Sequence, residues 1–175
     1  MNLRDVCSKI ELILSDVDGV MTDGGIYVQD NGEQIIKFHI RDGMGVRLWR
    51  EAGKRFGIVT GRKLESVKKR AADLWMDIVR LGVDDKLPEV DRLAAEFGIT
   101  REQVCYIGDD LLDLATIRAV GFGVAVADAA EDIQKAARYT TSLRGGQGAA
   151  REVIELILKN TGRWDDVLNR YGGSN

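Results

Sequence analysis

The stretch Ile10-Glu11-Leu12-Ile13-Leu14-Ser15-Asp16-Val17-Asp18-Gly19-Val20 decides the fold of this chain. It begins as an apolar run typical of a buried strand and ends in a turn that carries two carboxylates. Because side chains alternate along a strand, Asp16 and Asp18 can project toward one side. Two like charges this close are costly unless a cation or a shared proton lies between them, and Mg²⁺ prefers oxygen ligands. The pair indicates either a metal-assisted catalytic site or two ordinary turn residues, since aspartate is common in turns.

The composition limits the classes of protein to which the chain can belong. Its 175 residues suffice for one compact domain, and 45% hydrophobic with 30% charged residues is typical of globular proteins. The net charge of −3 gives no electrostatic case for nucleic acid. The first residues lack the apolar segment of a signal peptide, and no apolar run approaches a membrane span. Cys7 and Cys105 are too few for a disulfide framework. We therefore expect a cytoplasmic protein without nucleic-acid or membrane partners.

Apolar, β-rich runs alternate with helical patterns along the rest of the chain. Strands are predicted at about 10–16, 55–60, 77–81, 104–107, 123–126 and 139–141, and helices at about 44–51, 64–74, 87–97, 111–120, 131–137, 149–158 and 164–171. This alternation predicts an α/β fold, a doubly wound Rossmann-like parallel sheet with helices on both faces. Residues 24–40 instead predict a β-hairpin, because Asn31-Gly32 is a strong turn signal. The absence of linkers and repeats predicts a single domain over residues 1–175.

Polar residues follow several predicted strands at the point where each strand ends. Asp16 and Asp18 follow the first strand, Thr60 ends the second, and Asp109 follows the fourth. Lys86 lies somewhat further beyond the strand at 77–81. In open α/β sheets, ligand sites form outside the carboxyl ends of the strands, near a switch in strand order. We therefore expect these acids, the hydroxyl and the base to meet at one edge of the sheet.

A phosphate monoester is the substrate that this set of groups fits. Its negative oxygens resist an attacking anion, and Mg²⁺ held by Asp16 and Asp109 would offset part of that charge. Lys86 would add a second cation, and Thr60 would donate a hydrogen bond to a phosphoryl oxygen. Asp16 could then attack phosphorus and form an aspartyl phosphate, while Asp18 carries the proton to the leaving group and from water.

Four segments resemble, in order, the motifs of the haloacid dehalogenase-like phosphatases: Asp16-Val17-Asp18-Gly19-Val20, Val59-Thr60-Gly61-Arg62, Lys86 and Gly108-Asp109-Asp110-Leu111-Leu112-Asp113. The resemblance implies that Asp16 is the nucleophile and Asp18 the general acid and base, with a backbone carbonyl on Mg²⁺. It also implies that Asp109 is a metal ligand. Asp110 would contact the metal directly or through water, whereas Asp113 is interpreted as a residue outside the ligand set or on a helix face.

The resemblance is closer to the 3-deoxy-D-manno-octulosonate 8-phosphate phosphatases. Their signatures are similar to Phe38-His39-Ile40-Arg41-Asp42-Gly43-Met44-Gly45-Val46-Arg47, Asp85-Lys86-Leu87, Val126-Ala127-Asp128-Ala129 and Arg144-Gly145-Gly146-Gln147-Gly148-Ala149-Ala150-Arg151-Glu152. The resemblance implies a capless enzyme of lipopolysaccharide precursor synthesis with a β-hairpin in place of a cap domain, active as a homotetramer on a sugar acid phosphate. The implied substrate-binding residues are His39, Arg41, Asp42, Gly43, Arg47, Arg62, Arg70 and Lys86.

Other interpretations stay open at this stage. The substrate could be a nine-carbon sugar acid 9-phosphate, although Arg62 favours the eight-carbon acid because a related nine-carbon phosphatase group carries Glu there. The chain could also be a partner module of a sugar-acid cytidylyltransferase, or, as a weaker alternative, a receiver domain. His39, which stands where relatives commonly have Asn, could be structural. Arg70 could belong to a solvated helix face, and Gly145-Gly146-Gln147-Gly148 could be a flexible loop or reach a neighbouring subunit.

Overall fold

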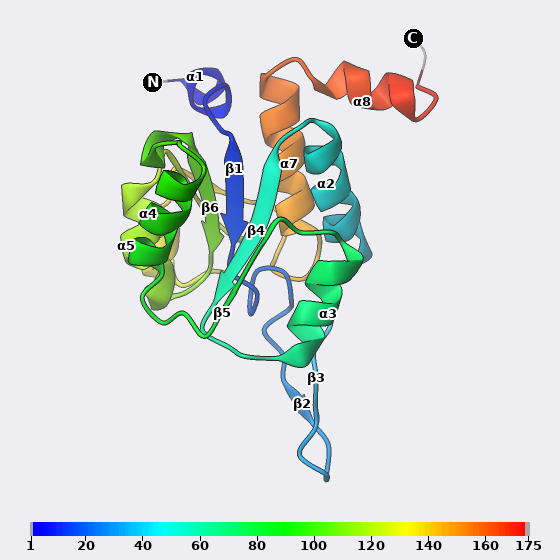
Figure 1. Cartoon of the computed structure of the whole chain (residues 1–175), viewed down its shortest axis with the longest axis vertical. Coiled ribbons are helices and arrows are strands. Elements are labelled where there is room, and N and C mark those ends of the chain that lie inside the picture. Colours follow the sequence, from blue (N-terminus) through cyan, green and yellow to red (C-terminus); the bar gives the residue numbers. More distant parts are fainter. Residues whose placement is uncertain (1, 174–175) are drawn as a thin grey trace.

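The protein, seen in a computed structural model that describes residues 2–173, is built on one six-stranded sheet (Figure 1). The strand order is β5-β4-β1-β6-β7-β8, and every neighbouring pair is parallel. The strands are β1 (Leu12–Ser15), β4 (Arg55–Thr60), β5 (Ile78–Leu81), β6 (Val104–Gly108), β7 (Phe122–Ala125) and β8 (Tyr139–Thr140). The chain builds outward from β1 to β5 and then returns to β6 on the other side of β1. The carboxyl ends of β1 and β6 therefore flank the switch point, where ligands bind in such sheets.

Helices cover both faces of the sheet, which explains why its central strands are apolar throughout (Figure 1). All four residues of β1 are buried, as are all five of β6. One layer holds α1 (Leu3–Cys7), α2 (Ile40–Glu51), α3 (Glu65–Asp73) and α7 (Ala149–Asn160), and α8 (Trp164–Arg170) follows α7. The other layer holds α4 (Lys86–Glu96), α5 (Leu114–Ala119) and α6 (Glu131–Ala136). The predicted doubly wound parallel fold is confirmed.

The hairpin between β1 and α2 is shorter than the sequence predicts. Its strands are β2 (Tyr27–Val28) and β3 (Gln34–Ile35), which pair antiparallel and project beyond the sheet (Figure 1). An isolated bridge between Thr22 and Phe38 ties its base to the body of the protein. Between β1 and α2 the chain forms this hairpin rather than a folded cap, so the expected capless architecture is confirmed.

The start of α2 corrects a predicted boundary. Apolar alternation predicts extended chain to residue 40 and a helix from residue 44, whereas the helix begins at Ile40. His39, whose backbone is extended, precedes the helix. The Nδ1 atom of His39 accepts a hydrogen bond of 3.3 Å from the Arg41 backbone N–H. Asp42 lies in the first turn, where a negative charge stabilises a helix. These local capping interactions outweigh the alternating pattern.

Other differences are small and lie at element ends. The predicted helix at 111–120 is a 3-10 turn, η2 (Leu111–Asp113), followed by the short α5, because the Asp113 side chain folds back onto the preceding turn. Helix α1 and the 3-10 turn η1 (Arg101–Gln103) were not expected. Within residues 2–173, none of the helices has the length and apolar character needed to cross a membrane.

Candidate active site

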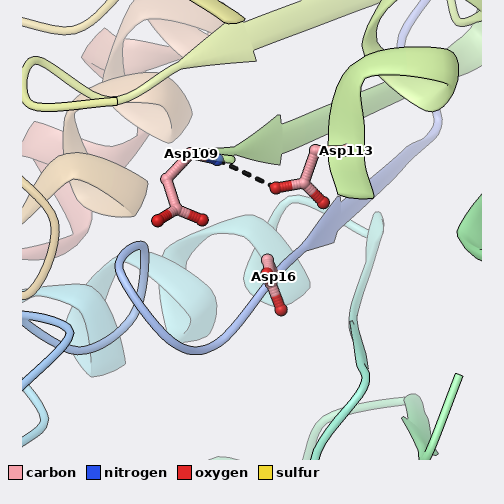
Figure 2. Close-up of side chains that lie close together, drawn as sticks. All are labelled: Asp16, Asp109 and Asp113. Atoms are coloured by element: carbon pink, nitrogen blue, oxygen red, sulfur yellow. Dashed lines mark hydrogen bonds between the residues drawn. The ribbon is translucent and has the colours of Figure 1, made fainter. Parts of the chain in front are cut away.

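Three carboxylates converge at the switch point of the sheet (Figure 2). Asp16 follows β1, Asp109 follows β6, and Asp113 ends η2. One oxygen of each lies within 4.8 Å of the others. Parallel pairing of β1 with β6 brings the first two together, since Ser15 and Ile107 are partners at the strand ends. The sequence prediction that Asp16 and Asp109 meet at one sheet edge is thus confirmed.

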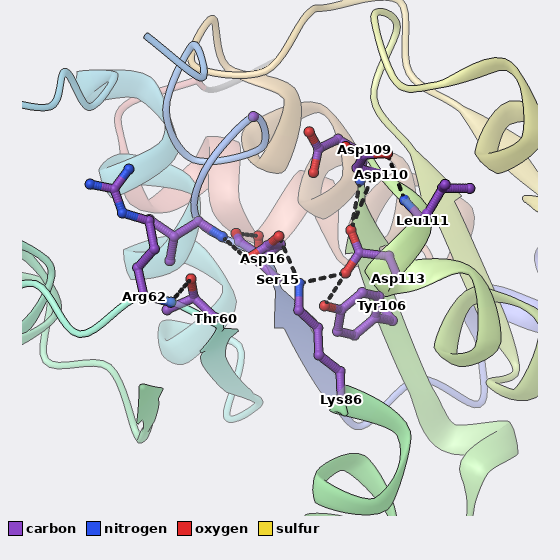
Figure 3. Close-up of polar contacts among 12 residues, drawn as sticks. Ser15, Asp16, Thr60, Arg62, Lys86, Tyr106, Asp109, Asp110, Leu111 and Asp113 are labelled. Carbon is purple, nitrogen blue, oxygen red and sulfur yellow. Dashed lines mark hydrogen bonds and ion pairs between the residues drawn. The ribbon is translucent and has the colours of Figure 1, made fainter. Parts of the chain in front are cut away.

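Lys86 places a positive charge between two of these acids (Figure 3). It is the first residue of α4, and its side chain is only 1% exposed. Its Nζ lies 2.7 Å from Asp16 Oδ2 and 2.7 Å from Asp113 Oδ1. A lysine buried this deeply needs partners of opposite charge. Lys86 is therefore a buried, paired residue of the site rather than a solvated lysine at a helix start.

Asp113 organises the site, although the sequence analysis interprets it only as a residue outside the ligand set or on a helix face. Its Oδ1 accepts from Lys86 and from the Tyr106 hydroxyl at 2.7 Å. Its Oδ2 accepts from the backbone N–H groups of Asp109 at 2.9 Å and Asp110 at 3.4 Å. Both oxygens are engaged, so Asp113 orients Lys86 and the turn after β6 rather than offering a free ligand to a metal ion. Tyr106 was missed altogether, and the spacing Gly108-Asp109-Asp110-x-x-Asp113 was the available signal for Asp113.

Two glycines make room for these carboxylates. A Cβ on Gly19, whose φ is +75°, would lie 2.0 Å from Asp109 Oδ2. A Cβ on Gly108 would lie 2.5 Å from the Asp113 side chain. Any larger residue would displace an acid, so both motifs need glycine for steric reasons.

The electrostatic state of the site favours a bound cation. Burial raises the pKa of Asp16 to about 6, although the Lys86 charge opposes the shift. Burial, and next the charge of Asp16, raise the pKa of Asp109 to about 7. Each carboxylate makes ionisation of the other less favourable, and one lysine does not balance them. A hard divalent cation fits this set of oxygen donors, and Asp16 and Asp109 are the residues placed to hold it.

A cleft of about 320 Å³ opens over these groups. Thr60 ends β4 at its wall, and the Thr60 hydroxyl oxygen accepts from the Arg62 backbone N–H at 3.3 Å (Figure 3). Arg62 also donates from one guanidinium arm to Asp18 Oδ1 at 3.2 Å. The cleft is lined by Asp16, Asp18, Gly19, Gly24, Thr60, Gly61, Arg62, Lys86, Asp109, Asp110, Leu112 and Asp113. The residues of the four motifs for which a catalytic or metal-binding role is predicted therefore all line this cleft.

Asp110 lies at the exposed rim of the cleft. Its Oδ1 accepts from the Leu111 backbone N–H at 2.7 Å and so caps η2. A metal contact by Asp110, direct or through water, stays a prediction.

The remaining predicted substrate-binding residues lie elsewhere in the chain. His39, Arg41, Asp42, Gly43, Arg47 and Arg70 belong to α2, its cap, and α3. Gly43, Arg47 and Arg70 line a second cavity of about 240 Å³ together with Ile40, Met44, Leu74 and Trp75. Of the predicted set, Arg62 and Lys86 therefore line the cleft and these three residues line the α2–α3 cavity, whereas His39, Arg41 and Asp42 line neither.

Asp42 is almost fully buried, and its surroundings are those of a helix-capping residue. Its Oδ1 accepts a hydrogen bond of 2.9 Å from the Arg151 backbone N–H in the first turn of α7. Burial raises the pKa of Asp42, and the backbone N–H groups at the start of α7 oppose the shift. Asp42 thus joins the beginnings of α2 and α7, and a contact of Asp42 with substrate stays a prediction.

The glycine-rich segment before α7 packs on the loop that follows β1 (residues 16–24, here called the catalytic loop) of its own chain. The Gly146 N–H donates to the Val20 carbonyl at 2.9 Å. A Cβ on Gly145 would lie 1.8 Å from the Gly19 carbonyl oxygen, and one on Gly146 would lie 2.3 Å from the Asp23 nitrogen. These glycines form a close backbone contact behind Asp18, so the plain flexible-loop interpretation is wrong. A role in a neighbouring subunit stays a prediction.

Comparisons with known proteins agree with this geometry. The model of the haloacid dehalogenase-like hydrolases matches residues 70–152. The 3-deoxy-D-manno-octulosonate 8-phosphate phosphatase of Escherichia coli strain K12 is 41% identical over 166 residues, which cover 93% of this chain and 88% of that protein.

Solved structures are similar over nearly the whole chain. A Pseudomonas syringae protein, described as a probable yrbi family phosphatase, has a TM-score of 0.95 and 40% identity, with 99% of this chain and 98% of that one covered. The Moraxella catarrhalis 3-deoxy-D-manno-octulosonate 8-phosphate phosphatase, solved with a magnesium ion, a phosphate ion and KDO, has a TM-score of 0.93 and 35% identity, with 97% and 99% covered. With its motifs gathered at the strand ends and this identity along its length, the chain belongs to the haloacid dehalogenase-like hydrolases, in the family of 3-deoxy-D-manno-octulosonate 8-phosphate phosphatases.

Proposed function

We propose that the protein is a Mg²⁺-dependent phosphatase that hydrolyses 3-deoxy-D-manno-octulosonate 8-phosphate to 3-deoxy-D-manno-octulosonate and phosphate. One observation carries the proposal: the Asp16 carboxylate stands at the floor of an open cleft, held by buried Lys86 and beside Asp109. This arrangement supplies a nucleophile, a fixed cation and a metal ligand at one point.

The reaction runs in two displacements at phosphorus. A carboxylate oxygen of Asp16 attacks the phosphorus while the bond to the sugar oxygen breaks, and Asp18 gives that oxygen its proton. Water then attacks the phosphorus of the aspartyl phosphate, and Asp18 takes a proton from it. Inorganic phosphate leaves and Asp16 is regenerated. Lys86 stabilises negative charge on the phosphoryl oxygens, and the Thr60 hydroxyl donates a hydrogen bond to one of them.

Mg²⁺ is the cofactor of this reaction, and when bound it offsets phosphoryl charge and orients the phosphorus toward Asp16. Asp16 and Asp109 would hold it through side-chain oxygens, Asp18 through its backbone carbonyl, and Asp110 directly or through water. The donors are all oxygen atoms, which suits a hard cation.

The eight-carbon substrate is supported by the relatives and by Arg62. The E. coli and M. catarrhalis relatives are named for this phosphate ester. Arg62 is a cation lining the cleft that is not committed to Asp16, and a guanidinium can pair with a carboxylate through two parallel hydrogen bonds. The relatives give no such support to a nine-carbon substrate or to a partner module of a cytidylyltransferase.

The active assembly is a homotetramer that completes the open cleft. The hairpin presents Ile26, Tyr27, Val28 and Ile35, each more than half exposed, and such apolar clusters mark contact surfaces. The arginines of the α2–α3 cavity would then bind substrate from a neighbouring subunit. The enzyme acts in the cytoplasm, on a precursor of lipopolysaccharide.

The test is phosphate release from 3-deoxy-D-manno-octulosonate 8-phosphate, with and without Mg²⁺, compared with a panel that includes the nine-carbon ester. We expect the eight-carbon ester to have the highest kcat/KM and chelation of Mg²⁺ to abolish turnover. Asp16→Asn should lose activity while keeping the fold, because an amide is not a nucleophile here. Turnover that persists in this variant contradicts the mechanism, and a preference for the nine-carbon ester contradicts the assigned substrate.

A further inference from the structure

Arg62 connects the cleft to the hairpin. One arm of its guanidinium donates to Asp18 Oδ1 at 3.2 Å, and the other arm donates to Gln34 Oε1 on β3. The guanidinium is planar and its donors stand in a fixed fork, so two acceptors in different directions fix its orientation. Asp18 belongs to the catalytic loop, whereas Gln34 comes from the hairpin, so Arg62 is held by two separate parts of the molecule.

The contact with Gln34 matters because little else holds the hairpin strands. Both residues of β2 and both of β3 are exposed, and the hairpin projects beyond the sheet (Figure 1). Its base is tied by the Thr22–Phe38 bridge and by an ion pair of 2.6 Å between Lys37 and Asp23. At Gln34 the projecting strands thus touch a side chain that lines the cleft.

Gln34 also decides what Arg62 can do in the free enzyme. A guanidinium with one acidic neighbour tends to pair with it through both arms. Because Gln34 accepts from one arm, Arg62 pairs with Asp18 through the other arm only. The amide is neutral, so an incoming carboxylate can replace it without meeting a negative charge.

We propose that Gln34 is a positioning residue for substrate selectivity: it holds the Arg62 guanidinium open for the carboxylate of the substrate and keeps it from closing on Asp18. The inference rests on the proposed function, since it assumes a substrate that carries both a phosphate ester and a carboxylate. A pre-oriented arginine loses less conformational entropy when substrate binds. This strengthens substrate binding, and so lowers KM, with little effect on the rate of the chemical step.

The test compares two phosphate esters on the full-length enzyme with Mg²⁺. One is 3-deoxy-D-manno-octulosonate 8-phosphate, and the other is p-nitrophenyl phosphate, which has no carboxylate. Gln34→Leu keeps the size of the side chain but removes the acceptor. We expect it to raise KM for the sugar acid ester about tenfold, the order of one hydrogen bond to a charged group, with kcat within about threefold. The increase in KM for p-nitrophenyl phosphate should be smaller than the increase for the sugar acid ester by a factor of at least about five.

Three further variants separate positioning from folding. Gln34→Glu keeps an acceptor oxygen but adds a negative charge that competes with the substrate carboxylate for Arg62, so it should recover little of the lost affinity. Gln29→Leu changes an exposed glutamine of the same hairpin and should leave both esters unaffected. In an Arg62→Leu background, Gln34→Leu should add almost nothing, because the residue through which it acts is gone.

The outcomes distinguish this inference from the proposed function. Equal losses on both esters, or a full additional loss in the Arg62→Leu background, overturn the role of Gln34 while leaving the phosphatase assignment intact. A wild-type preference for the nine-carbon ester overturns the assigned substrate alone, and the same comparison on that ester still tests Gln34. A wild-type enzyme that does not favour carboxylated esters over p-nitrophenyl phosphate overturns both.

Discussion

At the scale of single residues, the site depends on how each acid is surrounded. Asp16 and Asp113 both contact Lys86 at 2.7 Å, yet their surroundings differ. Asp113 is fully engaged by Lys86, the Tyr106 hydroxyl and two backbone N–H groups, whereas Asp16 lines the open cleft. The geometry therefore leaves Asp16 available for chemistry and uses Asp113 to hold the lysine in place.

Asp113→Asn tests this division. The amide offers one acceptor oxygen where the carboxylate offers two, so either Lys86 or the turn after β6 loses its partner. We expect kcat to fall by about 10- to 100-fold, as for other residues that orient a metal site. Phosphate release measures the effect, and circular dichroism checks the fold. Tyr106→Phe, which removes one hydrogen bond but not the Lys86 contact, is the matched control and should lose far less activity. Equal losses in both variants would contradict the role of Asp113.

Titration of Asp16 and Asp109 predicts how stability depends on pH in the metal-free protein. Their folded-state pKa values of about 6 and about 7 lie above those of the unfolded chain, so the folded state binds more protons between about pH 4 and pH 7. The contribution of these groups to stability is therefore fully present below about pH 4 and is lost as the pH rises through about 7.

The prediction is that Mg²⁺ stabilises the protein more at pH 8 than at pH 6, because protons compete with the metal for the same oxygens. Thermal unfolding with EDTA and with Mg²⁺ at each pH measures this difference. Asp109→Asn should raise the Tm of the metal-free protein at pH 8 and remove most of the response to Mg²⁺. A response that is the same at both pH values would show that these acids do not hold the metal.

At the scale of elements, loops and helix ends bring the site together. The segment before α7 packs its glycines on the loop after β1, and Asp42 at the start of α2 caps α7. Residues near the start of α7, far away in sequence, therefore hold the backbone next to Asp18 in place. The position of the catalytic loop thus depends on how α2 and α7 pack together.

Gly146→Ala tests whether this packing serves catalysis. Gly146 has φ of +64° and would bring a Cβ to 2.3 Å from the Asp23 nitrogen, so the loop must move. Gly98 has φ of +65° and open space around it, which makes Gly98→Ala a control for backbone strain alone. Both variants should lose about 1 kcal/mol of stability from strain. Gly146→Ala should lose more and should also lower kcat at least about tenfold. An unchanged kcat in Gly146→Ala would show that this loop contact is not needed for catalysis.

Asp42→Ala should weaken the start of α7. Loss of a capping carboxylate costs about 0.5–2 kcal/mol in free energy of unfolding, which urea denaturation measures. Asp42→Asn keeps an acceptor oxygen for the Arg151 N–H and should recover much of that stability. If Asp42→Asn is as unstable as Asp42→Ala, the hydrogen bond at 2.9 Å is not the source of the effect.

At the scale of the whole molecule, the open cleft and the projecting hairpin belong together. A phosphatase without a cap domain leaves its site accessible to water, and catalysis is favoured when water is excluded. The hairpin carries exposed apolar residues, and the cleft lies at the carboxyl ends of the strands. The hairpin projects beyond this same end of the sheet (Figure 1). Assembly of four chains through this surface would both bury it and close the site.

Charged substitutions on the hairpin test the assembly. Tyr27→Asp combined with Ile35→Asp places two charges opposite each other in the β2–β3 pair, where an apolar contact is proposed. We expect light scattering to show smaller species than for the wild type and kcat/KM for the sugar acid ester to fall. Glu33→Asp, a change at the exposed hairpin tip, is the control and should leave the tetramer intact. A wild-type protein that is monomeric at assay concentration would refute the assembly.

Much of the fold could be predicted because its signals are local. The run from Arg55 to Thr60 forms β4 with the predicted bounds, and apolar runs placed the other strands of the sheet to within a few residues. The start of α2 was missed because capping by His39 competes with an alternating pattern, and pattern alone does not show which is stronger. Asp113 was undervalued because its importance depends on four hydrogen-bond partners held at once, and the charged one, Lys86, comes from a distant part of the chain.

The sequence by itself determined the reaction type, because Asp16, Thr60, Lys86 and Asp109 lie at or beyond the ends of strands and parallel strands end at one edge. Only the tertiary structure decided which acid is free and which is engaged. It also decided that Asp42 caps a distant helix and that Gln34 reaches Arg62. The physical reason is that hydrogen bonding and burial depend on groups brought together by folding, whereas strand and turn signals depend on neighbours in the chain.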